Sequence, residues 1–183
     1  MKKLFLFAII ATFLACNSNK TASEVDETIS TVARIDDHYS NAIKEINEDY
    51  TKNDFSKFDD MVSDSARVYF NSTVPITKKE WKELAQSHHL YFDSIAWNKD
   101  SYYVKTDSLI KDEKHENNTL KAGNIYTSVW YTWNGIGKTT HTKIANAGNI
   151  IFQWQNNKII AARFVFDPTP LVNEITATNN AKK

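Results

Sequence analysis

The sequence predicts an α+β fold in which N-terminal helices pack on a curled antiparallel sheet. In the first half of the folded part, apolar residues recur every three or four positions, which is typical of amphipathic helices. From Ser94 onward the period changes to two, which is typical of strands with one buried face. Because the helices precede the strands and do not alternate with them, the order favours separate helical and sheet layers.

The first predicted elements are three helices with one strand among them. An apolar stripe from Val32 to Tyr50 predicts a long helix, and Asp54 is a plausible N-cap for a short second helix. A strand is expected at residues 66–71. Thr77 and Glu80 have the spacing of a capping box that opens a third helix. The apolar stripe of that helix contains Trp81, Leu84, Ala85, His88 and either Tyr91 or Phe92.

Short strands are then expected up to the end of the sheet. The run at residues 111–118 is charged and is expected to be an exposed connection, and Gly148 is expected to mark a bulge. The expected strands are 95–97, 102–104, 125–133 (ended by residues 134–137) and 138–147, followed by a closing hairpin at 149–167.

The closing hairpin is the most β-rich run of the sequence, and its loop length follows from its side-chain pattern. A two-residue loop would pair Trp154 with Ile159 and place Arg163 on the apolar face. A three-residue loop at residues 156–158 instead collects the apolar residues on one face, so we expect that loop. The apolar face would then contain Ile150, Phe152, Trp154, Ile160, Ala162, Phe164 and Phe166.

Composition limits the classes of function. With 183 residues and 42% hydrophobic content, one domain with a real core is expected. Lysine plus arginine equals aspartate plus glutamate at 22 each, so we expect no nucleic-acid partner. His88 and His89 are adjacent and would point ~100° apart on a helix, while His38 and His115 lie in exposed contexts. We therefore expect no metal site and no cofactor.

The N-terminus has the features of a secretory signal. Lys2 and Lys3 precede an apolar run at residues 4–14, which is shorter than the ~20 residues that span a bilayer. The run ends in Leu-Ala-Cys16, which resembles the lipobox of bacterial lipoproteins, with a departure at Phe13. The resemblance implies a signal peptide at residues 1–15, and lipid on Cys16 that anchors the protein in the bacterial cell envelope.

The residues after the lipobox complete this prediction. Asn17, and not Asp, follows Cys16, so nothing indicates retention in the inner membrane and we expect the outer membrane. Residues 16–30 are polar at first and are expected to be a flexible tether. A plain secreted protein with a chance cysteine is the alternative.

The order of elements and four short motifs resemble the nuclear transport factor 2-like superfamily, which includes SnoaL-like polyketide cyclases, ketosteroid isomerase and scytalone dehydratase. The motifs are Asn53-Asp-Phe-Ser-Lys-Phe58, Trp133-Asn-Gly135, Phe152-Gln-Trp-Gln-Asn-Asn-Lys-Ile159 and Phe166-Asp-Pro168. The resemblance implies a domain at residues 31–175, with a disordered tail at 176–183. It also implies a cone-shaped fold in which the sheet curls round the helices and leaves an apolar pocket.

The resemblance to this superfamily does not imply isomerase activity for this sequence. Ketosteroid isomerases use a tyrosine, a general-base aspartate and a protonated aspartate. On this sequence those positions fall at Ile46, Phe70 and Ile150, and none of these side chains can hold or move a proton. Tyr69 or Tyr39 could replace a donor, but no carboxylate stands near the base position.

Two other sets of residues are candidates for the pocket. His88 and His141 could perform the acid–base chemistry that scytalone dehydratase-type members do with histidines, although a histidine on an apolar face is more often a core residue. Trp97, Trp130, Trp133 and Trp154 could stack on a ring-shaped ligand, or fill a core or a dimer interface. The expected pocket residues are Tyr39, Ile46, Phe70, Trp81, His88, Trp130, Ile150, Phe152, Trp154, Phe164 and Phe166.

Two classes of function follow from these observations. The first is a non-catalytic, membrane-anchored module that binds a small apolar ligand or a protein partner, with a homodimer through the sheet as one form. The second is a SnoaL-like or dehydratase-like enzyme that uses His88 and His141. The absence of carboxylates from the isomerase positions favours the first class.

Overall fold

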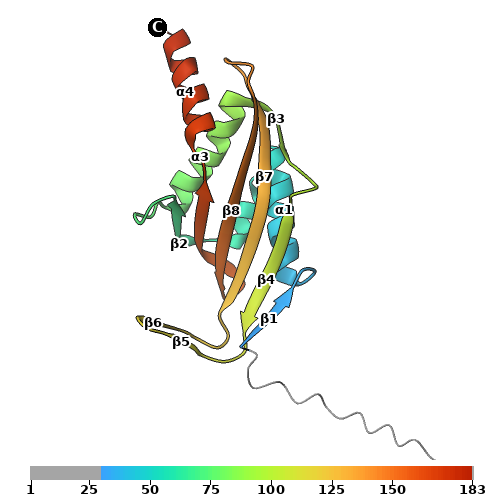
Figure 1. Cartoon of the computed structure of the whole chain (residues 1–183), viewed down its shortest axis with the longest axis vertical. Helices are drawn as coiled ribbons and strands as arrows, with labels where there is room; N and C mark the ends of the chain where they lie inside the picture. The colour runs from blue at the N-terminus through green and yellow to red at the C-terminus, as the bar shows by residue number, and fades with distance from the viewer. Residues whose placement is uncertain (1–29, 183) are drawn as a thin grey trace, which may run out of the picture.

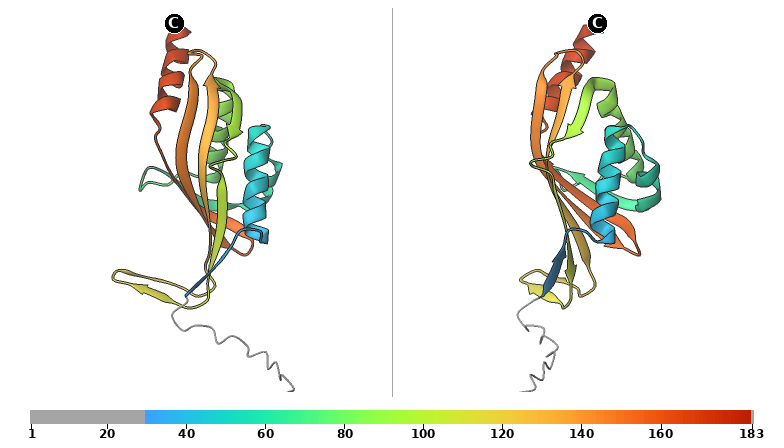
Figure 2. Two further views of the ribbon diagram at one scale, coloured as in Figure 1. Left: turned by 45° about the vertical axis from the view of Figure 1, so that its right-hand side comes forward. Right: turned by 90° about the vertical axis from the view of Figure 1, so that its right-hand side faces the viewer.

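The computed structural model describes residues 30–182 and shows helices on one side of a strongly bent sheet (Figures 1 and 2). The predicted signal peptide, Cys16 and nearly all of the predicted tether lie outside the described residues. Within the described range, no helix has the length and apolar character needed to cross a membrane.

Three helices cover one face of the sheet, as the right-hand view of Figure 2 shows. They are α1 (His38–Thr51), α2 (Ser56–Met61) and α3 (Lys78–Tyr91). The predicted capping box is confirmed, because the Thr77 hydroxyl accepts from the Glu80 N–H while the Glu80 carboxylate accepts from the Thr77 N–H. The second helix begins at Ser56, whose N–H and hydroxyl both donate to Asp54.

The start of the first predicted helix is wrong. The chain forms strand β1 (Thr31–Arg34), which pairs antiparallel with β4, and α1 begins only after Asp37. Asp37 is the N-cap, and its carboxylate accepts a hydrogen bond from the Ser40 N–H at 2.7 Å. A strong N-cap therefore divides an apolar pattern that by itself runs on through both elements.

The sheet has the order β1-β4-β7-β8-β9-β2, and β3 pairs with the far half of β7. Its long central strands are β7 (Ile125–Gly137) and β8 (Lys143–Gln155). The strand predicted to end before residue 134 in fact continues to Gly137. β2 runs parallel to β9, so the sheet is mixed and not wholly antiparallel as predicted. The other strands are β2 (Val62–Phe70), β3 (Phe92–Trp97), β4 (Tyr103–Leu109) and β9 (Lys158–Phe166).

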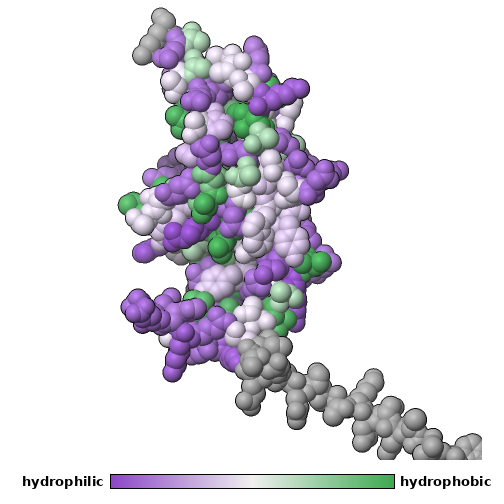
Figure 3. Space-filling view, viewed as in Figure 1, coloured by the Kyte–Doolittle hydropathy of each residue, from purple (hydrophilic) through white to green (hydrophobic). Residues whose placement is uncertain are grey.

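The predicted charged connection forms a small hairpin of its own. It contains β5 (Glu113–His115) and β6 (Asn118–Leu120), which pair only with each other. Its surface is hydrophilic and projects from the body at the lower left of Figure 3. The prediction of an exposed segment is confirmed, whereas its two short strands were not predicted.

The closing hairpin has a two-residue turn and a bulge, in place of the predicted three-residue loop. Asn156 and Asn157 have φ angles of 51° and 58°, as a type I′ turn requires, and Trp154 pairs with Ile159. Ile160 is then an extra residue in β9, and it moves the rest of the strand by one position. Beyond it the expected face is restored, with Phe152 opposite Ala162.

Gly148 has a different function from the predicted bulge, because β7 and β8 pair without interruption through it. The phenol of Tyr131 crosses directly over this glycine. A β-carbon at Gly148 would lie 2.5 Å from the Tyr131 hydroxyl oxygen, so only glycine leaves room for the ring.

The last helix, α4 (Thr169–Ala181), replaces the predicted disordered tail. Its Glu174 is 1% exposed, and its carboxylate accepts hydrogen bonds from the Thr139 and Thr140 N–H groups and the Thr140 hydroxyl. Burial acts to raise the pKa of this carboxyl, but the hydrogen bonds prevail and hold the pKa below its usual value. Glu174 thus fixes α4 to the β7–β8 turn.

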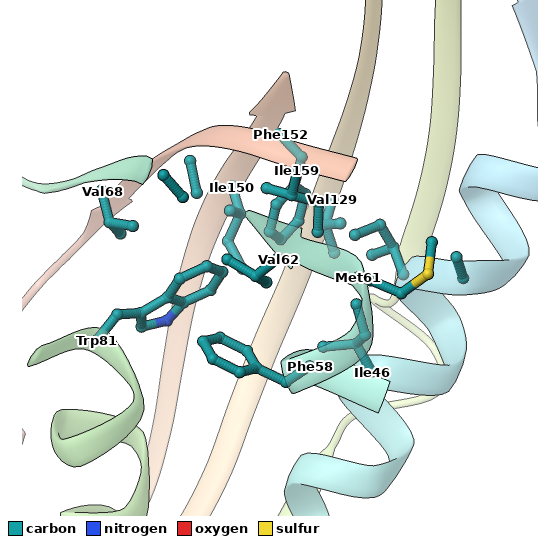
Figure 4. Packing of buried hydrophobic residues seen from close by; sticks show 14 of the residues in the cluster. Ile46, Phe58, Met61, Val62, Val68, Trp81, Val129, Ile150, Phe152 and Ile159 are labelled. Carbon is teal, nitrogen blue, oxygen red and sulfur yellow. The ribbon is translucent and has the colours of Figure 1, made fainter. Parts of the chain in front are cut away.

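The core lies between the inner face of the sheet and the three helices. In Figure 4 the rings of Trp81 and Phe58 lie next to each other between α3, α2 and the sheet, and they meet edge to face with centroids 4.7 Å apart. Phe152, Ile159 and Val129 form the sheet side of this cluster, with exposures of 1% or less. Burial of these side chains fixes the sheet against the helices.

Buried hydroxyls join α1 to the sheet within this core. The Trp154 indole N–H donates to the Thr127 hydroxyl at 2.9 Å, and the hydroxyls of Thr127 and Thr106 lie 2.8 Å apart. Thr106 reaches the Ser40 hydroxyl at 2.8 Å, and Ser40 donates to the Arg34 carbonyl at 3.4 Å. We call this series the hydroxyl relay. Each of its three hydroxyls has a partner on both sides.

Candidate functional site

An apolar cavity of about 100 Å³ lies between the helices and the inner face of the sheet. The residues that line it come from every layer of the fold. They are Ile46, Asn47, Tyr50, Phe55, Phe58, Phe70, Trp81, Leu84, Ala85, His88, Trp97, Tyr131, Trp133, Asn146, Ile150, Phe152, Phe164, Phe166 and Leu171. None of these residues is a carboxylate, a lysine or an arginine.

Aromatic rings form one wall of the cavity. The rings of Phe70 on β2 and Phe164 on β9 are stacked, with centroids 4.3 Å apart and an interplanar angle of 18°. Trp81 on α3 meets Phe164 edge to face at 5.6 Å. Because these rings pack against one another on three different elements, the wall is stiff and presents flat apolar surfaces.

A second wall carries a short series of polar groups that we call the imidazole relay. The Trp133 indole N–H donates to the Tyr50 hydroxyl oxygen at 3.0 Å. The same hydroxyl lies 2.7 Å from His88 Nδ1. Since an indole N–H can only donate, the Tyr50 oxygen accepts from Trp133 and its own proton is free for His88.

Burial keeps the relay neutral. It lowers the pKa of His88 to about 4, with a smaller contribution from the neighbouring His89. Burial also raises the pKa of Tyr50 well above its usual value, although the hydrogen bond from Trp133 acts in the opposite direction. At neutral pH both side chains are therefore uncharged, and Tyr50 keeps the proton that it shares with His88.

Further polar atoms stand at the cavity without a partner in the described chain. The Tyr131 hydroxyl makes no hydrogen bond, and burial raises its pKa to about 12. Asn146 donates through Nδ2 to the Asp167 carbonyl at 2.8 Å, which leaves its Oδ1 unpaired. No buried side-chain nitrogen or oxygen of the described residues lacks a partner, so these atoms are accessible.

The structure brings most of the predicted pocket residues together. Ile46, Phe70 and Ile150 all line the cavity and are apolar. The others that do so are Trp81, His88, Phe152, Phe164 and Phe166. The periodicity of the helices and strands thus found the inward-facing positions correctly.

Four predicted site residues lie elsewhere. His141 is exposed in the turn between β7 and β8, so it does not meet His88. Trp130 is 45% exposed beside Tyr103, because odd-numbered residues of β7 face inward and Trp130 faces outward. Tyr39 and Trp154 line a second, more polar hollow of about 280 Å³ at the Asn156–Asn157 turn.

Sequence reasoning missed part of the lining. Tyr50 follows Ile46 by four positions on α1, and Tyr131 lies on the inward face of β7, so the same periodicity predicts both. Trp97 and Trp133, which were candidates for stacking on a ligand, do line the cavity. Asn47 and Asn146 are buried polar residues that no apolar pattern indicates. Leu171 belongs to a helix that was not predicted.

The site has no built metal centre in the described residues, since no three histidine, cysteine or acidic side chains gather between residues 30 and 182. Its chemistry is that of an apolar cleft with a few neutral hydrogen-bonding atoms.

Comparison with known proteins identifies the fold by structure and not by sequence. No family model matches the sequence, and a search of curated proteins found no relative.

Solved structures give clear likenesses. A candidate polyketide cyclase from Xanthomonas campestris pv. campestris matches with a TM-score of 0.54 at 9% identity, over 74% of this chain and 95% of that one. A candidate polyketide cyclase from Silicibacter sp. TM1040 matches with a TM-score of 0.52 at 8% identity, over 73% and 92%. A nuclear transport factor 2-like protein of unknown function from Burkholderia pseudomallei matches with a TM-score of 0.51 at 12% identity, over 75% and 96%.

Proposed function

We propose that this chain, whose domain has the nuclear transport factor 2-like fold, is an envelope-anchored lipoprotein that binds a small, ring-bearing apolar molecule in its cavity without transforming it. The observation that carries the proposal is the apolar cavity itself, which is lined by Ile46, Phe70 and Ile150, the residues at which the resemblance to ketosteroid isomerases would put acid and base groups. A proton-transfer site needs a group that titrates near the working pH. His88 is neutral and already bonded to Tyr50.

The size of the cavity limits the ligand. Pockets for drug-sized ligands have about 300–1,000 Å³, whereas a cavity of ~150 Å³ holds one benzene. At about 100 Å³ this cavity is smaller than the benzene cavity, so a one-ring ligand would fill it and extend beyond it. At ~0.5–0.7 kcal/mol per non-hydrogen atom, a ligand of about eight atoms would bind with a Kd of the order of 0.1–1 mM.

A cavity-filling substitution tests the binding site. Ala85 lines the cavity from α3, and Gln86 is exposed on the same helix. We expect the Ala85→Phe full-length protein to lose binding of ethylbenzene, measured by calorimetry, while Gln86→Phe binds as the wild type does. Equal binding by all three proteins, with far-UV circular dichroism unchanged, would place the ligand outside this cavity and refute the proposal.

Membrane anchoring rests on the sequence around Cys16. The basic residues Lys2 and Lys3, the short apolar run and the Leu-Ala-Cys16 sequence support it. Expression of the full chain with labelled fatty acid should label the wild type and not Cys16→Ser, and only the wild type should sediment with membranes. Membrane association of the unlabelled variant at the wild-type level would contradict the lipoprotein proposal.

An acid–base enzyme that uses His88 together with His141 lacks support, because His141 is exposed outside the cavity. If the two histidines acted together in turnover, the wild type would convert cyclic ketones and His141→Phe would lose that activity. We expect no turnover by the wild type, measured by chromatography of the incubated ketone.

A further inference from the structure

The hydrogen bonds of the imidazole relay favour one of the two neutral forms of the His88 ring. Trp133 donates to the Tyr50 oxygen, so the Tyr50 proton is directed to His88 Nδ1. A neutral imidazole that accepts at Nδ1 must carry its single proton at Nε2. The relay thus ends in one N–H donor, His88 Nε2–H.

This terminal donor has no partner in the described chain. The only hydrogen bond of the His88 ring is the one to Tyr50. Because no buried side-chain nitrogen or oxygen of residues 30–182 is left without a partner, Nε2 must reach accessible space. The His88 side chain lines the cavity, so we assign the accessible space at Nε2 to the cavity.

From this geometry we infer that His88 Nε2–H selects the ligand, which is a neutral, one-ring molecule with a hydrogen-bond acceptor such as a ketone, aldehyde or ester oxygen. The inference rests on the proposed binding function and makes its ligand class specific. Tyr50 is a positioning residue, since it acts on the ligand only by holding the donor tautomer of His88.

The cavity lining also explains why the ligand must be neutral. A carboxylate would lose its hydration among phenylalanine and tryptophan rings, and no lysine or arginine lines the cavity to compensate. An ammonium group would meet no carboxylate there. One neutral hydrogen bond added to apolar burial favours a ketone over a hydrocarbon of the same shape about 3–10-fold.

The experiment compares three ring compounds of similar size with the full-length protein. We expect acetophenone to bind about 3–10-fold more tightly than ethylbenzene, and benzoate to show no binding. In His88→Phe, which retains a flat ring but no donor, the ratio for the two neutral ligands should fall to about 1 while ethylbenzene still binds. His141→Phe is the matched control, because it removes an exposed histidine and should leave the ratio unchanged.

A spectroscopic test separates positioning by Tyr50 from mere packing. The ¹⁵N shifts of His88 should show the Nε2–H tautomer in the wild type, and a mixture of tautomers in Tyr50→Phe. The acetophenone preference should fall in Tyr50→Phe as well. This variant also tests the inference if His88→Phe does not fold.

The outcomes distinguish the inference from the proposed function. Equal binding of acetophenone and ethylbenzene, both abolished by Ala85→Phe, would overturn the donor role of His88 and leave the binding cavity intact. Binding of benzoate as tight as that of acetophenone would overturn the neutrality of the ligand. If neither neutral compound binds, both the proposed function and this inference are wrong.

Discussion

Two buried polar relays in this protein begin alike and end differently. The hydroxyl relay starts at the indole N–H of Trp154 and passes through three hydroxyls to the Arg34 carbonyl. The imidazole relay starts at the indole N–H of Trp133 and passes through Tyr50 to His88. The first ends on an acceptor and is complete, whereas the second ends on a donor that has no partner among residues 30–182.

The difference teaches how to separate a structural network from a binding group. A buried network in which every donor meets an acceptor stabilises one arrangement of the fold and offers nothing to a ligand. A network with one open end at a cavity keeps its last group oriented while leaving it available. Both relays join α1 to the sheet, so their surroundings are comparable. The feature that distinguishes them is the unpaired donor at the end of the imidazole relay.

The largest expected effect is on stability, from breaking the middle of the complete relay. Thr127→Val keeps the shape of the side chain, leaves the Trp154 N–H without an acceptor and removes the bond between Thr127 and Thr106, while Thr106 keeps its bond to Ser40. We expect the free energy of unfolding to fall by about 2–4 kcal/mol in urea denaturation. Thr132→Val, on the outward face of the same strand, should change it by less than ~0.5 kcal/mol. Equal losses in both variants would show that the hydroxyl relay contributes no more to stability than an outward-facing threonine does.

The next effect is on the pH dependence of stability. The pKa of His88 is about 4 in the folded protein and near 6.5 in the unfolded chain. Between these values the unfolded chain binds a proton that the folded protein does not, so stability falls as the pH decreases from 6.5 to 4. We expect this histidine to contribute about 1–3 kcal/mol of that fall. Unfolding curves of wild type and His88→Phe across this range should diverge, and parallel curves would contradict the buried neutral imidazole.

A smaller effect on stability is expected from Tyr50→Phe. The change leaves the Trp133 N–H without an acceptor, but His88 can move its proton to Nδ1 and accept a hydrogen bond from water at the cavity. We expect a loss of about 1–2 kcal/mol, below that of Thr127→Val. A loss of stability as large as that of Thr127→Val would show that the imidazole relay, like the hydroxyl relay, has no accessible group at its end.

The sequence predicted the apolar surfaces of this fold better than its polar connections. Residues such as Phe152 and Phe164 follow a strict period of two, so their inward face could be read without knowing the turn. The turn itself was wrong, because the bulge at Ile160 is set by the preference of Asn156 and Asn157 for positive φ and not by apolar pattern.

The two polar relays could not be predicted from the sequence, for a related reason. Tyr50, His88 and Trp133 are 38 to 83 positions apart where they pair, so only the packed sheet and helices bring them together. The pairing of His88 with His141 rested on the resemblance to scytalone dehydratase-type members and on the apolar stripe that contains His88, but the turn between β7 and β8 places His141 in solvent. Periodicity indicates which side of an element is buried, and it does not indicate which buried groups meet.

The smallest expected effect concerns the far end of the hydroxyl relay, and it tests whether the hydroxyls act as one series. Ser40→Ala leaves the Thr106 proton without an acceptor, while the bond lost to Arg34 is long at 3.4 Å. The cost should be about 1 kcal/mol. In the double variant Ser40→Ala/Thr106→Val, the Thr127 hydroxyl is the one donor without an acceptor. Since each of the two variants leaves one donor unpaired, the double variant should lose about as much stability as Ser40→Ala alone. Ser128→Ala on the outward face is the control. Losses that simply add would show independent bonds, whereas a double-mutant coupling of about 1 kcal/mol would show a relay with a single direction from Trp154 to Arg34.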